Sequence, residues 1–337
     1  MHARRAPSSG AAAAAPGSTA GRRRSARGAG RGPLHRLRTD PAALIGVALV
    51  ALAVLMIPAA PLYTALSGND PYTYNTDLLA ANTAPAGPLG GMSAAHPFGL
   101  EPRTGRDLLA IVLWGSHVSL FIGLAATVVS VIIGVAVGIT AGYFGGLADR
   151  LLSRFTDVVF GFPFLIFAIA LSAVVPDRFP KSVVLVAVIG LFGWPSIARV
   201  VRSEALSLRS RGFVRAARAT GIPAGTILIR EILPNLAATI IVFTTMSLPA
   251  KIGTEAALSF LGVGINPPTP SWGRTISSAV EWVQVDPLYL VFPGAALFVV
   301  TLGFTLFGDG LRDALDPRTA ETGADAGAPA AAEEAIR

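Results

Sequence analysis

The sequence contains no cysteine, only two lysines and few charged side chains of any kind. Without cysteine, neither a disulfide framework nor a thiolate metal site can form. Charged residues make up 14% of the 337 positions, whereas a soluble domain usually has about 25%. Because 52% of the residues are hydrophobic and the mean hydropathy is +0.60, the composition predicts an integral membrane protein.

The scarcity of lysine also bears on ATP hydrolysis. A P-loop requires the pattern G-x-x-x-x-G-K-[ST], but Lys181 follows Pro180 where glycine is needed, and Lys251 lacks the motif altogether. HExxH and GxSxG sequences are also missing. We therefore expect no catalytic residues, no cofactor, no metal site and no ATPase activity in this chain.

The net charge of +7 does not indicate nucleic-acid binding. The arginines flank apolar runs, as membrane topology demands, and no nucleic-acid motif is present. The expected contact for this charge is membrane lipid.

Six apolar runs are long enough to cross a hydrocarbon core of about 30 Å. They cover residues 41–63, 115–142, 155–175, 182–200, 235–256 and 288–308. Lipid offers no water to satisfy the backbone, so each is expected to be a helix. The first run is longer than the apolar part of a secretory signal peptide, about 7–15 residues, and a retained helix is favoured over that alternative.

The segments between and beyond these runs define the expected organisation. Residues 1–40 and 317–337 have the composition of disordered tails. Residues 64–106 are rich in Pro, Gly, Asn and Asp and form an extramembrane segment, while 107–316 form the main transmembrane domain. With six spans and both termini cytoplasmic, 21 of the 27 basic residues lie on the cytoplasmic side, as the positive-inside rule requires. Residues 64–106 are then extracytoplasmic.

Between the fourth and fifth runs lies a short cytoplasmic segment, residues 211–225, with the sequence RGFVRAARATGIPAG. On a helical wheel, its small and apolar residues share one face, at spacing i, i+3, i+4 and i+7: Phe213, Ala216, Ala217 and Thr220. Its arginines share the opposite face: Arg211, Arg215 and Arg218. A glycine and a proline, Gly221 and Pro223, end the helix. An alanine face inserts poorly into lipid, so docking into a partner protein is favoured over docking on the membrane surface.

These residues carry a resemblance. The Ala216–Ala217 pair, Gly221 four residues on and Leu233–Pro234 resemble the signature loop of ABC importer permeases. The resemblance implies that residues 211–235 form a coupling loop that seats in the ATP-binding subunit. It assigns ATPase coupling to the following residues: Phe213, Arg215, Ala216, Ala217, Thr220, Gly221 and Pro234. Two positions depart from the family's pattern: Arg215 stands where the family usually has glutamate, and Glu231 stands where it usually has isoleucine.

Further stretches resemble the dipeptide, oligopeptide and nickel class of these permeases. They are GRDLL at 105–109, AGYFGGLADRLLSRFTDVVFGFP at 141–163 and EAALSFLGVGINPPTPSWG at 255–273. The long basic N-terminal tail is similar to that of the second permease of the pair. The resemblance implies an all-α, six-helix permease that forms half of a pathway for di- or oligopeptides. Its partners would be a second permease, two ABC ATPase subunits and an extracytoplasmic solute-binding protein. A nickel importer is the alternative within this class, and a stand-alone secondary transporter is an alternative outside it.

Three further features lead to expectations. The glycines at 134, 138 and 142 predict a helix-packing face, within the chain or toward the second permease. Lys251 and Glu255 stand at i, i+4 and are expected to pair near the end of the fifth run. Glu255 and His117 are candidates for the pathway or its gate.

Overall fold

The computed structural model describes residues 37–176 and 178–315. Five long apolar helices dominate it: α2 (Pro41–Ser67), α3 (Leu108–Phe144), α6 (Lys181–Leu208), α9 (Leu233–Phe260) and α11 (Leu288–Leu315). Each is long and apolar enough to cross a membrane, and the expectation of an all-helical membrane protein is confirmed. The predicted tails lie almost entirely outside the described residues.

The third predicted span, 155–175, is not one straight helix. It divides into α4 (Gly146–Gly161) and α5 (Phe164–Val174), and the two helices meet at an angle of 73°. The break falls at Phe162 and Pro163, and Pro163 caps α5 without continuing α4 because a proline lacks the backbone donor and clashes with the preceding turn. Within residues 37–176 and 178–315 there are therefore five continuous spans, or six when this bent pair is counted as one.

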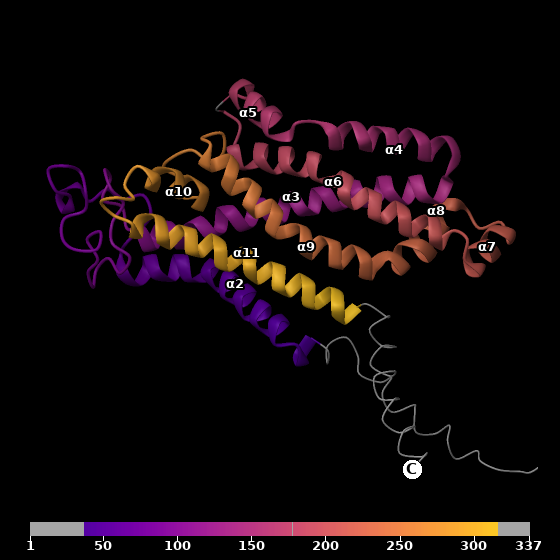
Figure 1. Ribbon diagram of the computed structural model, residues 1–337, viewed down its shortest axis with the longest axis horizontal. Helices are drawn as coiled ribbons and strands as arrows, with labels where there is room; N and C mark the ends of the chain where they lie inside the picture. The colour runs from indigo at the N-terminus through magenta and orange to yellow at the C-terminus, as the bar shows by residue number, and fades with distance from the viewer. Residues whose placement is uncertain (1–36, 177, 316–337) are drawn as a thin grey trace, which may run out of the picture.

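The glycine stripe of α3 packs within the chain, which settles the question left open by the sequence. A Cβ on Gly134 would lie 2.8 Å from that of Ile197, and one on Gly138 would lie 2.8 Å from that of Val201. Both neighbours belong to α6. Because lipid supplies no hydrophobic drive between helices, close backbone contact of this kind is what holds them together. The pair α3–α6 thus forms the centre of the bundle (Figure 1).

At one end of the bundle the loop 68–107 and the short helix α10 (Trp272–Val280) lie close together (Figure 1). A buried ion pair lies within this loop, with Arg106 Nε 2.6 Å from Glu101. Arg106 also donates to the carbonyl of Pro268 at 2.9 Å, and Tyr289 donates to Glu101 at 2.7 Å. Burial by itself would lower the pKa of Arg106, but the hydrogen bond and charge of Glu101 raise it above its ordinary value. The Pro-Pro-Thr-Pro stretch at residues 267–270 is not helical.

The opposite end carries α7 (Gly212–Ala219), α8 (Ala224–Ile227) and the π-helical turn Leu228–Ile232 (Figure 1). Helices α2 and α11 pack side by side along the bundle. The first residues of α2 and the last of α11 lie toward this α7 end in Figure 1. Helix α7 therefore lies at the end of the bundle where α2 begins and α11 ends (Figure 1).

Candidate functional site

Helix α7 has only two turns and is held by its inner face. Val214 is fully buried and Ala217 is 9% exposed. They belong to one apolar cluster with residues of α3, α6, α8 and α9 and of the π-turn: Ile139, Tyr143, Ile197, Val201, Ala205, Ile227, Ile232 and Leu236. A helix this short is marginal in water, so this packing is what fixes it to the bundle.

The C-terminal end of α7 is closed by a Schellman motif. The N–H of Gly221 binds the carbonyl of Arg218 at 3.0 Å, and the N–H of Ile222 binds the carbonyl of Ala217 at 3.1 Å. This motif requires a left-handed residue, and Gly221 has φ of 78°. The predicted role of Gly221 as a left-handed cap is confirmed.

All three arginines of the predicted face, Arg211, Arg215 and Arg218, are exposed, and Arg218 also contacts α3. Its guanidinium lies 4.3 Å from the ring centre of Tyr143, and its Nε donates to the Tyr143 hydroxyl at 3.2 Å. Arg218 follows the buried Val214 by four residues. Part of its long side chain therefore rests on the Tyr143 ring, while the residue as a whole stays exposed.

The outer face of α7 is exposed. Phe213 is 41% exposed, and Ala216 and Thr220 are exposed beside it. Arg215 and Gly221 are exposed as well. The structure therefore brings most of the predicted coupling residues onto one surface, which we call the α7 surface: Phe213, Arg215, Ala216, Thr220 and Gly221. Ala217 was expected on this face but packs inward.

Pro234 is the second residue of α9 and is exposed. It follows the π-helical turn Leu228–Ile232 directly. Proline cannot donate the backbone hydrogen bond that an α-helix would require there, and a π-turn is a common way to accommodate such a break. Pro234 therefore shapes the return from α7 into α9 and does not belong to the α7 surface.

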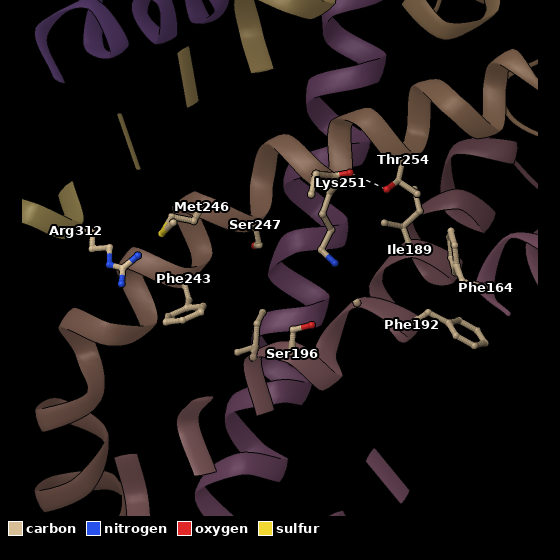
Figure 2. A pocket seen from close by; sticks show the side chains of 13 residues that line it. Phe164, Ile189, Phe192, Ser196, Phe243, Met246, Ser247, Lys251, Thr254 and Arg312 are labelled. Atoms are coloured by element: carbon tan, nitrogen blue, oxygen red, sulfur yellow. Dashed lines mark hydrogen bonds between the residues drawn. The ribbon is translucent and has the colours of Figure 1, made fainter. Parts of the chain in front are cut away.

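A second feature is a cavity of about 460 Å³ midway along the bundle (Figure 2). It lies between a stripe of α6 and a stripe of α9, and α5 and α11 contribute one residue each. The α6 stripe consists of Ile189, Phe192, Gly193, Ser196 and Ile197. The α9 stripe consists of Phe243, Met246, Ser247, Ala250, Lys251 and Thr254. Phe164 and Arg312 complete the lining.

The predicted ion pair between Lys251 and Glu255 is wrong. Lys251 points toward Gly193 and the cavity (Figure 2), whereas Glu255 accepts hydrogen bonds from Ser259 at 2.8 Å and Ser271 at 3.0 Å. Glu255 is fully buried and joins the end of α9 to the residue before α10. The carboxylate of Glu255 is thus bound by two hydroxyl groups, one on α9 and one just before α10, and not by the lysine.

Neither of the predicted pathway residues lines this cavity. Glu255 lies beyond its end, and His117 stacks on Trp114 with ring centres 5.0 Å apart. The residues that do line the cavity were not predicted from the sequence. Their spacing could have indicated them, because positions 189, 192, 193, 196 and 197 of α6 follow the helical pattern i, i+3, i+4, i+7 and i+8 and combine a glycine and a serine with aromatic and aliphatic residues. Within residues 37–176 and 178–315, no group of three or more His, Cys, Asp or Glu could hold a metal ion.

Comparison with known proteins identifies the class. The family described as "Binding-protein-dependent transport system inner membrane component" matches residues 134–321. The dipeptide transport system permease protein DppC of Alkalihalophilus pseudofirmus is 36% identical over 288 residues, which cover 86% of this chain and 90% of that protein. The glutathione transport system permease protein GsiD of Escherichia coli is 43% identical over 228 residues, 68% of this chain and 74% of that protein. The oligopeptide transport system permease protein OppC of Haemophilus influenzae is 35% identical over 286 residues, 84% of this chain and 87% of that protein.

Proposed function

The chain belongs to the family of binding-protein-dependent transport system inner membrane components, and we propose that it forms half of the pathway through which an ATP-driven importer moves di- or oligopeptides. The names of the dipeptide, oligopeptide and glutathione relatives support a peptide substrate. The second permease of the pair completes the pathway. The chain itself has no P-loop, so two ATPase subunits supply the energy.

The observation that carries the proposal is the two-sided character of α7. Val214 and Ala217 fix its inner face to α3, α6 and α9, whereas Phe213 and Ala216 leave its outer face open. A small-residue face lets a partner backbone approach closely. Motion of an ATPase subunit that gripped the α7 surface would therefore pass directly into the helices that line the cavity.

The α7 end is assigned to the cytoplasm. The positive-inside rule supports this assignment, because seven arginines lie between residues 199 and 230. Both termini then lie in the cytoplasm, since α2 begins and α11 ends toward the same end of the bundle (Figure 1). The loop 68–107 faces outward, where a solute-binding protein can deliver its cargo.

The cavity between α6 and α9 is the proposed share of the pathway. Its position midway along two membrane helices and its mixed aromatic and hydroxyl lining suit a solute of peptide size. Glu255 is proposed to act at the outer gate, because its bonds to Ser259 and Ser271 hold the end of α9 against the start of α10. His117, near the same end of α3, is the second gate candidate.

The absence of cysteine makes a clean test of coupling and orientation possible. Ala216→Cys places a single thiol on the α7 surface, and Ala94→Cys places one in the exposed loop at the other end. We expect a bifunctional reagent to link position 216 to an ATPase subunit during uptake. A membrane-impermeant thiol reagent should label position 94, and not position 216, in intact cells. Failure of position 216 to capture an ATP-hydrolysing neighbour in actively importing cells would refute the coupling proposal.

The substrate needs a separate measurement. A deletion strain should lose growth on di- and oligopeptides and keep its normal nickel requirement, and the wild-type chain should restore the growth. Loss of nickel accumulation with unchanged peptide growth would favour the nickel alternative.

A further inference from the structure

The ammonium group of Lys251 enters the cavity without an acidic partner. Lys251 is 7% exposed, and within the part of the chain that the structure describes it forms no ion pair. The nearest carboxylate along the helix, Glu255, accepts hydrogen bonds from Ser259 and Ser271 and forms no ion pair with Lys251. Placing a charge among membrane helices without a counter-ion is unfavourable, so this position is suited to an anion that arrives with the solute.

The rest of the lining has the same preference. Lys251 and Arg312 are the charged residues among the described side chains that line the cavity, and no aspartate or glutamate joins them. The neutral polar groups are hydroxyls: Ser196, Ser247 and Thr254. Three phenylalanines supply apolar surface: Phe164, Phe192 and Phe243. A cation beside aromatic rings matches a molecule with a carboxylate at one end and apolar side chains next to it.

Gly193 provides the space that this lysine needs. A Cβ built on Gly193 would overlap the Lys251 ammonium, and the Ser130 hydroxyl would lie 2.7 Å from it. Any side chain at position 193 would therefore displace the ammonium and leave its charge in the cavity. A substitution at Gly193 therefore tests the position of the Lys251 charge, whereas a substitution of Lys251 itself tests its presence.

We infer that Lys251 binds the free α-carboxylate of the transported peptide and so sets a specificity for peptides with an unmodified C-terminus. The inference rests on the proposed function and assigns one residue to recognition within the pathway. Ammonium–carboxylate bonds are charge-assisted and stronger than neutral ones. A carboxylate that loses such a partner inside a low-dielectric site should be transported about 10- to 100-fold more slowly.

The experiment compares a tripeptide of Ala and Phe residues with its C-terminal amide, so that the terminal group is the only carboxylate. The complete importer is reconstituted in proteoliposomes, and uptake is measured at concentrations that saturate the binding protein with each peptide. We expect the wild-type importer to take up the free acid at least about 10-fold faster than the amide. Lys251→Gln should abolish this preference, Lys251→Arg should keep it, and Gly193→Ala should reduce it.

Lys181→Gln is the matched control, because Lys181 is the other lysine of the chain and does not line the cavity. The preference of this variant for the free acid over the amide should equal that of the wild type. Equal slowing of both peptides by Lys251→Gln would assign the lysine to helix packing and overturn the inference, as would a wild type without preference. In both of those cases peptide import by the wild type still stands, whereas a wild type that imports no peptide would refute the proposed function itself.

Discussion

Arg218 of α7 and Tyr143 at the end of α3 are joined twice, by a hydrogen bond of 3.2 Å to the hydroxyl and by stacking of the guanidinium over the ring at 4.3 Å. This contact ties the proposed coupling helix to the helix that forms the centre of the bundle. Its two components can be removed one at a time.

Tyr143→Phe removes the hydrogen bond and keeps the ring, whereas Tyr143→Leu removes both. We expect Tyr143→Phe to weaken the attachment of α7 by about 1 kcal/mol and Tyr143→Leu to weaken it further, because the cation–π contact is also lost. The measurement is peptide uptake per ATP hydrolysed in the reconstituted importer, which should decrease in that order. Thr140→Val removes a hydroxyl that bonds only within α3 and should leave the ratio unchanged. Equal ratios in all four proteins would contradict the role given to this contact.

Gly221→Val should uncouple transport from ATP hydrolysis while the chain still inserts into the membrane. Gly221 has φ of 78°, and no atom lies within 4 Å of a Cβ added there. The substitution is therefore unfavourable because of the backbone conformation, by about 1–2 kcal/mol for a residue with a branched side chain. It destabilises the cap that orients α7. Gly221→Asn is the matched comparison, because asparagine tolerates the left-handed region and has a similar volume. Uptake and ATPase rates should be nearer the wild type in Gly221→Asn, and the reverse order would show that backbone conformation is not what matters.

Gly138→Ala should destabilise the bundle. The added methyl would lie 2.7 Å from the carbonyl oxygen of Ala198 and 2.8 Å from the Cβ of Val201, so α3 and α6 must move apart. Overpacking of this kind costs about 1–3 kcal/mol. Gly253→Ala is the control, because Gly253 is also helical but has no atom within 4 Å of an added Cβ; it should be neutral or slightly stabilising. Thermal unfolding of the purified chain in detergent measures both.

Asp286 introduces a pH dependence of stability at the α10 end. Burial raises the pKa of this carboxyl, although hydrogen bonds from the backbone of Tyr289 and Leu288 oppose the shift. The folded chain therefore binds the proton more tightly than the unfolded chain does. Stability is greatest below the ordinary aspartate pKa and falls as the pH rises through the raised value.

Asp286→Asn should remove this dependence, because an amide oxygen can still accept from Tyr289 and carries no charge. The midpoint temperature of the wild type should fall as the pH rises above the ordinary aspartate pKa, and that of Asp286→Asn should change less over the same range. Parallel curves for the two proteins would show that another group dominates the titration.

The sequence predicts some features of the structure better than others, depending on whether they are set locally along the chain. Apolar length alone located α2, α3, α6, α9 and α11, because the bilayer sets a minimum span and allows only helices. Gly221 and Pro223 located the end of α7, since a left-handed glycine at a helix C-terminus is a local requirement. These features are decided by the chain within a few residues of each position.

Features that depend on packing between helices could not be predicted from the sequence. A helix that is apolar all round gives no indication of which side meets lipid and which meets protein. The pairing of α3 with α6, the inward position of Ala217 and the separate partners of Lys251 and Glu255 therefore emerge only when the helices are packed. The cavity, too, exists only between the stripes of α6 and α9. Length, composition and capping fixed the helices, and tertiary packing alone determined which of their side chains face one another.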